Sequence, residues 1–182
     1  MSNIKPILVA FATASFLPAI AAAASAGGHD SGTVRAVADV IDAQGQTRGK
    51  ATLEQAKDGI HVQVQGVGLP AGVHAVHLHT VGTCTGPDFA SAGGHWNPGN
   101  KQHGHENPAG AHLGDMPNMT VASDGTGTMK AVIKGAALKG ETAPLLDADG
   151  AAVVIHAAAD DYKTDPTGNA GGRLAFGVIK AP

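Results

Sequence analysis

The chain has 182 residues, enough for one ordinary domain with a hydrophobic core. Its formal net charge of −3, with histidine neutral, argues against nucleic acid or an anionic membrane as the main partner. Its 26 glycines and 10 prolines indicate many turns, but they stay below the share that is typical of low-complexity chains.

The first 26 residues have the layout of a secretory signal peptide. Lys5 precedes an apolar run that ends in small residues, with ASA at 24–26 as an A-x-A cleavage site. A membrane anchor is the alternative, but Pro18 interrupts the run and small residues dominate its end. We therefore expect a signal peptide at 1–26, a mature domain at 27–182, a periplasmic location and no membrane attachment after cleavage.

Most of the remaining chain predicts short β-strands. GIHVQVQG at 59–66 alternates apolar and polar side chains, which is typical of a strand with one buried face. Asp124-Gly125 predicts the turn of a hairpin. The expected strands lie at 33–41, 50–53, 59–66, 73–79, 119–133 (a hairpin of two strands), 145–157 and 173–179. No segment predicts a convincing helix, so we expect an all-β, antiparallel sandwich or barrel of eight strands.

Two segments, 80–118 and 158–172, carry no strand pattern and are long for connections within a domain. The stretch HWNPGNKQHGHENPAGAHLGD at 95–115 lies in the first of them. It holds four histidines and an aspartate among Gly, Pro and Asn. Because it has too little apolar material to fold by burial, something other than a hydrophobic core must organise it.

Histidines on the expected strands predict a first metal site. His77 and His79 are two residues apart, so both side chains point to one face and form a chelating pair. His156 follows an apolar strand and can meet the pair across the fold, which gives nitrogen ligands of the kind that suit Cu(II). His74 is three residues before His77, so we expect it to face away and make structural hydrogen bonds. An ordinary hydrogen-bonded histidine is the alternative for each one alone.

The loop predicts a second site. His95, His103, His112 and Asp115 offer three imidazoles and one carboxylate, a complete tetrahedral set for structural zinc. Zinc binding, of order 10 kcal/mol in small sites, is also folding free energy and can order a loop that burial cannot. A solvated His-rich loop with loose metal affinity is the alternative, and local composition leaves the two open. His105 is a further candidate that spacing alone does not exclude.

These motifs together resemble the copper,zinc superoxide dismutases. The resemblance runs from about Val34 to the C-terminus and rests on HLH, GGHWNP, KQH, HLGD, VVIHAAADD and TGNAGGRLAFGVI. The eight-residue step from His95 to His103 and the nine-residue step to His112 also fit the family. The resemblance implies an eight-stranded, antiparallel Greek-key β-sandwich or barrel, immunoglobulin-like, with two long functional loops.

The resemblance also implies one copper and one zinc ion per chain. The implied copper ligands are His77, His79, His95 and His156, and the implied zinc ligands are His95, His103, His112 and Asp115. In the family His95 would bridge the two ions as an imidazolate. Asp160 matches a carboxylate that links a copper-ligand histidine to a zinc-ligand histidine, and Arg173 matches the arginine beside the copper where an anion docks. His105 matches no ligand, and His74 matches a structural histidine.

The implied reaction converts superoxide to oxygen and hydrogen peroxide by Cu(II)/Cu(I) cycling, with Arg173 and His95 as catalytic residues. Superoxide is then the expected small-molecule partner. Family members include monomers and dimers, so a homodimer is compatible with the resemblance. The alternative is a non-catalytic periplasmic protein for copper and zinc binding or delivery, because a fold does not settle a function. The complete copper set together with Arg173 favours the enzyme.

One departure from the family concerns a disulfide that ties the long loop to the last strand. Cys84, the only cysteine, matches one half, and Phe176 stands where the other half is expected. We expect Phe176 to replace part of the lost stability by packing, since burying a Phe contributes about 1.5–3 kcal/mol. Cys84 then either pairs between chains or is buried and inert.

The expected mature N-terminus is a separate candidate copper site. Cleavage after Ala26 would expose Gly27-Gly28-His29. Its free amine, two amide nitrogens and imidazole can surround Cu(II) in a square plane. We treat copper capture or delivery by this segment as a hypothesis.

Overall fold

The computed structural model describes Met1, residues 33–140 and residues 143–182. Apart from Met1, the expected signal peptide at 1–26 lies outside the described residues, and so does the segment 27–29. Within the described ranges, no helix has the length and apolar character needed to cross a membrane.

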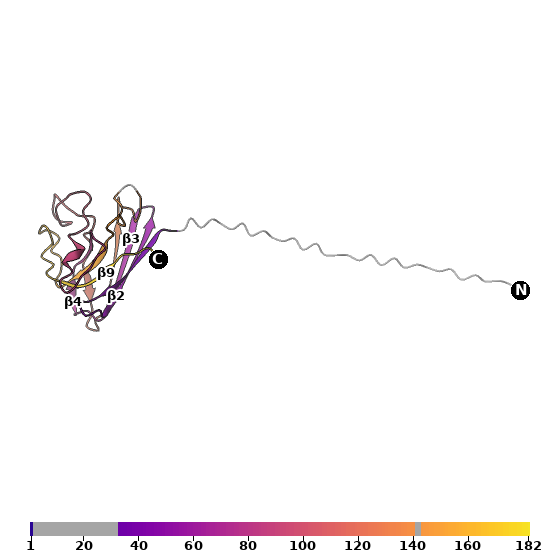
Figure 1. The fold of residues 1–182 in the computed structure, drawn as a ribbon, viewed down its shortest axis with the longest axis horizontal. Helices are drawn as coiled ribbons and strands as arrows, with labels where there is room; N and C mark the ends of the chain where they lie inside the picture. Colours follow the sequence, from indigo (N-terminus) through magenta and orange to yellow (C-terminus); the bar gives the residue numbers. More distant parts are fainter. Residues whose placement is uncertain (2–32, 141–142) are drawn as a thin grey trace. The chain divides into compact units, whose positions relative to one another are not determined.

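Nine antiparallel strands form one sheet in the described domain (Figure 1). Their bounds are β1 (Arg35–Ile41), β2 (Thr47–Ala56), β3 (Gly59–Gly66), β4 (Gly72–His74), β5 (Val76–His79), β6 (Met119–Val121), β7 (Gly127–Ile133), β8 (Ala152–His156) and β9 (Arg173–Val178). The order in the sheet is β4-β6-β7-β3-β2-β1-β9-β8-β5, and the sheet curls into a nearly closed barrel. The expected all-β antiparallel fold is therefore confirmed.

The strand count corrects our expectation of eight. The segment 73–79 forms two strands, because the chain leaves one end of the sheet and joins the other at Ala75. β4 pairs with β6 and β5 pairs with β8, at opposite ends of the sheet order. Ala75 itself donates its N–H to Ala158 O and accepts from His156 N, each at 2.9 Å. Apolar and polar residues alternate on both sides of the switch, and the one-position shift between Ala75 and Val76 does not by itself indicate a change of strand partner.

Two other strands have different lengths from those expected. β2 runs for ten residues around the weak candidate at 50–53, because it pairs with β1 on one side and β3 on the other. β8 starts only at Ala152. The preceding residues of the 145–157 candidate form turns, one of which is closed by Gly150 N–H donating to Asp147 Oδ1 at 3.1 Å.

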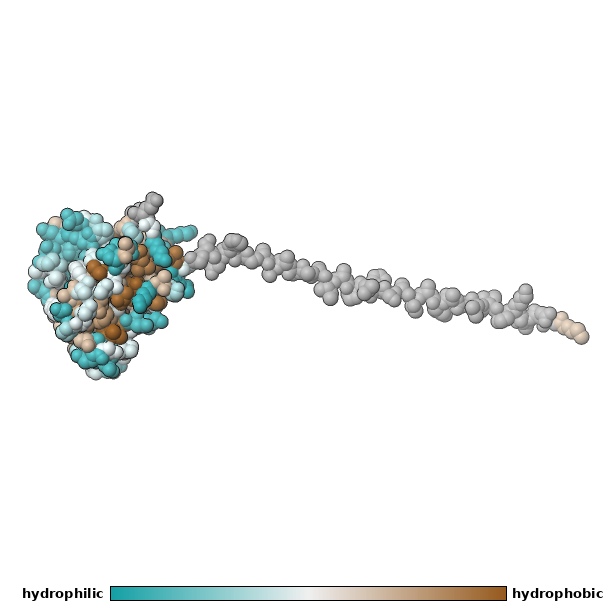
Figure 2. Space-filling model, in the orientation of Figure 1, coloured by the Kyte–Doolittle hydropathy of each residue, from teal (hydrophilic) through white to brown (hydrophobic). Residues whose placement is uncertain are grey.

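The inward faces of the strands supply the core. In β3, Ile60, Val62 and Val64 are at most 2% exposed, whereas the residues between them face outward. β5 and β8 differ, since every one of their residues is buried. Something must cover their outer side as well. On the face in view in Figure 2, hydrophobic side chains reach the surface among hydrophilic ones.

Two loops lie together on one side of the barrel, the long loop (residues 80–118) and the short loop (residues 158–172) (Figure 1). They contact each other through several polar contacts. His103 N–H donates to Asp165 Oδ1 at 2.6 Å, and Glu106 N–H donates to Tyr162 O at 3.0 Å. The long loop holds only one regular element, the short 3-10 turn η1 (Ala90–Ala92). Together the two loops enclose a polar region beside β5 and β8.

Candidate metal centre

The long loop returns along β5 and brings its histidines to those of the strand. Isolated bridges pair His79 with His95 and His77 with Asp115. Leu78 lies between these pairs and exchanges backbone hydrogen bonds with the loop, donating to Gly114 O at 2.9 Å and accepting from Trp96 N at 2.7 Å. A Cβ on Gly114 would lie 2.3 Å from Leu78 O. Glycine is therefore required there for the loop to approach the strand.

Four buried ring nitrogens converge in the first donor set. The atoms are His77 Nδ1, His79 Nε2, His95 Nε2 and His156 Nε2, and each lacks a hydrogen-bond partner among the described residues. These four side chains place donor atoms within 4.8 Å of one another. A buried nitrogen without a partner is costly, and four in one place are explained by a cation that they share.

The opposite nitrogens of these rings fix which atom carries the proton. His79 Nδ1 faces Gly93 O at 2.9 Å, His156 Nδ1 faces Gly171 O at 3.5 Å, and His77 Nε2 faces an Asp160 oxygen at 2.7 Å. Since carbonyl and carboxylate oxygens only accept, these nitrogens donate. Each inward nitrogen then presents a lone pair, as a metal ligand must.

Burial keeps three rings of this set, those of His79, His95 and His156, unprotonated. It lowers the pKa of His79 to about 2 and that of His156 to about 3, and neighbouring imidazoles push in the same direction. It lowers the pKa of His95 to about 4, although a hydrogen bond to Asp115 works in the opposite direction. At neutral pH these three imidazoles are neutral and available to a metal ion.

The second donor set is arranged around one carboxylate oxygen. Asp115 Oδ1 lies 3.0 Å from His95 Nδ1, 3.0 Å from His103 Nδ1 and 3.1 Å from His112 Nδ1. His95 Nδ1 and His112 Nδ1 are 3.4 Å apart. Zinc bonds of about 2.0–2.1 Å place tetrahedral ligands about 3.3–3.4 Å from one another. Three nitrogens and one oxygen at these separations fit a closed tetrahedral zinc site.

The backbone prepares the Asp115 carboxylate for this role. Its second oxygen accepts N–H groups from Gly104 at 2.9 Å and from His112 at 3.0 Å. Burial alone would raise the pKa of Asp115, but hydrogen bonds from His95 and the Gly104 N–H outweigh it and hold the pKa well below the usual range. The group is therefore ionised and supplies the negative charge of the second set.

His95 contributes one nitrogen to each set. Its Nδ1 lies beside Asp115 Oδ1, and its Nε2 belongs to the first set. Its ring centroid is 3.9 Å from that of His77. A single imidazole therefore connects two neighbouring cation sites.

Asp160 links the two donor sets through a hydrogen bond to one histidine of each. Its carboxylate accepts from His77 Nε2 at 2.7 Å and from His103 Nε2 at 2.9 Å. Burial raises the pKa of Asp160, but these two hydrogen bonds outweigh that effect, and the net pKa is lowered. The backbone of Asp160 is held by Asn118, whose amide accepts from Asp160 N at 2.9 Å and donates to Asp160 O at 3.0 Å. Sequence reasoning missed Asn118, since nothing in its spacing marks it.

The first donor set opens into a cleft of about 450 Å³ whose lining includes Arg173. The Arg173 guanidinium donates to Gly93 O at 2.7 Å and to Phe89 O. Among the described residues, no carboxylate lies within ion-pair distance of it. Its positive charge is therefore left to face the cleft, beside His79 and His156. The rest of the lining is Gly94, His95, His112, Pro166, Thr167 and Gly171.

Two of the candidate histidines, His74 and His105, lie outside both donor sets. His74 places its ring nitrogens 2.8 Å from His156 O and 2.9 Å from Pro70 O. His105 places Nε2 3.1 Å from the backbone oxygen of Asp115. Both make hydrogen bonds to the main chain, and neither offers a nitrogen to the converging atoms.

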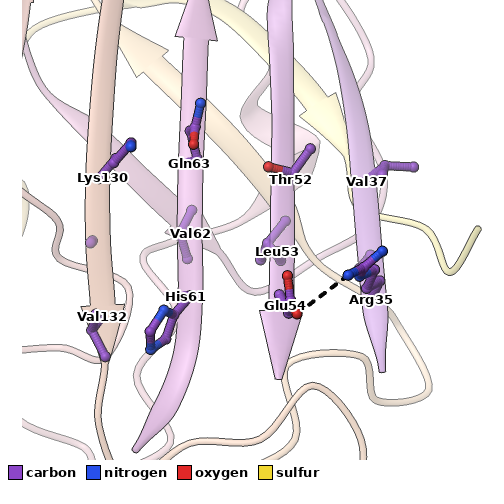
Figure 3. A pocket seen from close by; sticks show the side chains of 12 residues that line it. Arg35, Val37, Thr52, Leu53, Glu54, His61, Val62, Gln63, Lys130 and Val132 are labelled. Carbon is purple, nitrogen blue, oxygen red and sulfur yellow. Dashed lines mark hydrogen bonds and ion pairs between the residues drawn. The ribbon is translucent and has the colours of Figure 1, made fainter. Parts of the chain in front are cut away.

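A hollow of about 690 Å³ lies elsewhere, on the outer face of β1, β2, β3 and β7 (Figure 3). Two of its polar side chains have carboxylate partners, since Arg35 pairs with Glu54 at 3.5 Å and His61 Nε2 lies 2.8 Å from Asp58 Oδ1. Lys130, Gln63, Thr52 and Val37 lie in one row across neighbouring strands (Figure 3). The side chains do not converge on a point, so this hollow carries no chemistry comparable to the metal centre.

Comparison with known proteins agrees with this geometry. The family described as copper/zinc superoxide dismutase (SODC) matches residues 47–179. "Superoxide dismutase [Cu-Zn] 1" of Aquifex aeolicus is 43% identical over 145 residues, which cover 79% of this chain and 86% of that protein. "Superoxide dismutase [Cu-Zn]" of Caulobacter vibrioides is 42% identical over 148 residues, covering 80% and 85%. The crystal structure of a superoxide dismutase-like protein from Bacillus subtilis superposes with a TM-score of 0.74 at 37% identity, covering 78% and 95%.

The fold and the two donor sets define a metal-binding β-barrel protein with adjoining cation sites that share one histidine. Within that class the assignment is specific. The chain belongs to the copper/zinc superoxide dismutase family.

Proposed function

We propose that this protein is a superoxide dismutase that uses one copper and one zinc ion per chain. Copper would be held by the first donor set, His77, His79, His95 and His156. Zinc would be held by the second, His95, His103, His112 and Asp115. The observation that carries this proposal is the convergence of four buried, unpartnered nitrogens in a cleft beside an unpaired arginine. Family membership supports the same reaction.

Bound copper would supply one-electron oxidation and reduction, by which two superoxide ions and two protons give oxygen and hydrogen peroxide. The residues of this chain do the remaining work. Arg173 attracts and orients the small anion in the cleft, an electrostatic effect that weakens as salt is added. His95 Nε2 could take up a proton when it does not bind copper and could deliver it to the reduced oxygen species, while solvent would supply the second proton. The zinc set holds the long loop against β5 and so keeps His95 in place.

Removing the Arg173 charge tests the enzyme. Arg173→Ala should lower kcat/KM for superoxide by about tenfold or more, because the cleft loses its one guanidinium. Superoxide decay would be measured on protein loaded with copper and zinc, with metal stoichiometry determined on the same sample. Arg35→Ala, at an arginine whose side chain is 62% exposed on the far strand face, is the matched control and should leave the rate unchanged.

The same assay separates the enzyme from a storage or delivery protein. One copper and one zinc per chain with rapid superoxide decay supports the enzyme. Stoichiometric copper and zinc with no decay above that of free buffer would replace it with a non-catalytic metal-binding role. One relative, the Bacillus subtilis protein YojM, is 38% identical and is called a superoxide dismutase-like protein.

We also propose that residues 1–26 direct export to the periplasm and are then removed. The support is the charged start, the apolar run and the small residues at 24–26. N-terminal sequencing of protein from the periplasmic fraction should begin at Gly27. A different first residue would exclude the proposed copper site at Gly27-Gly28-His29, because that site needs the free amine of Gly27.

A further inference from the structure

The position of Arg173 depends on the long loop. Its guanidinium is held by two backbone carbonyls, those of Phe89 and Gly93, which flank the 3-10 turn η1 (Ala90–Ala92). No side chain on β9 or its neighbours provides a fixed anionic partner among the described residues. If this turn moved relative to β9, Arg173 would lose both acceptors at once.

The turn is too small to hold itself in place. It contains three residues and two backbone hydrogen bonds, with Ala92 N–H donating to Phe89 O at 3.2 Å and Gly93 N–H to Ala90 O at 3.0 Å. Phe89 begins it in the left-handed region, at φ 56°. Short helical turns of this kind are marginal without tertiary packing. An anchor outside the turn is therefore needed.

Hydrogen bonds from Val81 N–H to Ala92 O at 3.1 Å and from His79 Nδ1 to Gly93 O at 2.9 Å tie the turn to the end of β5, and the side chain of Phe89 anchors it toward β9. Phe89 is 1% exposed, and its ring centroid lies 4.3 Å from that of Phe176 on β9, with the ring planes 48° apart. The two rings form a small apolar cluster that is separate from the main core. Its buried members are Phe89, Ala92, Ala152, Val154 and Phe176, with Ile41 and Cys84 packed at its edge.

β9 therefore meets the turn at two points. Arg173 reaches the carbonyls of the turn, and Phe176, three residues later on the same strand, packs on the ring that begins it. Between them the pairing with β8 skips Leu174, since Ala175 pairs with Ile155 and Arg173 with His156. A bulge of this kind re-aims the neighbouring side chain and is common beside active sites.

A covalent tie between the same segments is impossible within this chain, because Cys84 is its only cysteine. Cys84 packs against the edge of the aromatic cluster and is half-buried. Burial raises the pKa of its thiol to about 11, so the group is an unreactive thiol at neutral pH. The contact between the two rings, with Ala92 buried in the same cluster, joins this turn to β9 by packing.

We propose that Phe89 and Phe176 are positioning residues that act as a non-covalent tie between the long loop and β9, and that they hold Arg173 in its anion-binding position. The proposal rests on the proposed function only in assigning an anion to the Arg173 cleft. It goes beyond that function in assigning two residues that touch neither metal nor substrate.

The test measures anion binding directly. Azide, a small anion, would be titrated into the copper- and zinc-loaded protein and followed by the Cu(II) absorption spectrum. Phe176→Leu and the volume-conserving Phe89→Met should each weaken azide binding about three- to tenfold, since each removes the aromatic pair but keeps the site apolar. Leu53→Ala is the control: Leu53 is a buried core residue of β2, and its loss should lower the melting temperature without changing azide affinity.

A double-mutant cycle shows whether the effect passes through Arg173. In an Arg173→Ala background, Phe176→Leu should change azide affinity less than twofold. Wild-type azide affinity in both folded phenylalanine variants would overturn the proposal, and so would an equal loss of affinity with and without Arg173. If the wild-type protein binds azide with this coupling but consumes no superoxide, the proposed function falls and the tie stands.

Discussion

At the scale of single residues, the metal centre depends on atoms behind the ligands as much as on the ligands themselves. The two oxygens of Asp160 accept hydrogen bonds from His77 and His103, so one carboxylate orients a ring in each donor set. Asn118 fixes the Asp160 backbone through its amide. Gly168 lies against the same carboxylate, and a Cβ there would be 2.0 Å from Asp160 Oδ1 and 2.6 Å from His103 Nε2.

Gly168→Ala should therefore disturb both ions. The methyl group would push the Asp160 carboxylate off the two histidines, and φ +64° at this position disfavours alanine as well. We expect zinc and copper affinity to fall about 10–100-fold, as after loss of other outer partners of metal ligands. Competition with a chromophoric chelator measures this. Gly172→Ala, in the same loop with nothing within 4 Å of its Cβ, is the control; equal affinities in the two variants would contradict the prediction.

At the scale of elements, the long loop is held by its buried donor residues and backbone contacts as well as by apolar packing. It carries three residues of regular structure in η1, yet His95, His103, His112 and Asp115 are all buried. Their ring nitrogens and one carboxylate oxygen lie close together. A zinc ion held by them, as proposed, would take the place of a hydrophobic core in this segment.

Removing zinc should loosen the long loop without unfolding the barrel. With a chelator selective for zinc, amide hydrogen exchange in residues 95–115 should accelerate by at least tenfold, because the loop loses its central cross-link. The strands β2 and β3 should keep their protection, since their eight paired positions and apolar faces are independent of the metal. Unchanged exchange in 95–115 would show that hydrogen bonds alone hold the loop.

The elements also show what alternation can and cannot predict. The sequence predicts the alternation in β3, the turn at Asp124-Gly125 and the shared face of His77 and His79. The change of partner at Ala75 cannot be predicted in this way, because a one-position shift in the alternation does not show which strand each half pairs with. The hydrogen-bond acceptors of Arg173 cannot be predicted from the sequence for another reason. They are the backbone carbonyls of Phe89 and Gly93, and because every residue has a carbonyl, no residue type marks them.

At the scale of the whole molecule, the buried histidines couple stability to pH. Burial lowers the pKa of His79 to about 2, of His156 to about 3 and of His95 to about 4, against about 6.5 in the unfolded chain. As the pH falls below 6.5, the unfolded chain takes up protons that the folded, metal-free protein does not. The folded state is therefore destabilised on the acid side and unaffected by these groups above about pH 7.5.

The free energy of unfolding of the metal-free protein should consequently drop between pH 6.5 and about pH 4.5. Three such groups give a limiting slope of about 4 kcal/mol per pH unit. The lowered pKa values of Asp115 and Asp160 act only near and below their ordinary range, so they do not oppose this trend in that window. Urea unfolding at several pH values measures it, and His79→Gln should reduce the slope by about a third. A flat profile from pH 7.5 to 5 would contradict the argument.

The shared ring of His95 has a consequence for how the protein acquires its ions. Because one imidazole supplies a nitrogen to each donor set, filling either position orients a ligand of the other. If both positions take an ion as proposed, occupancy of one would alter the affinity of its neighbour, and thermodynamic reciprocity would make the two effects equal in size. Loading would then be cooperative, and a protein with one ion would be a distinct species rather than half of the finished one.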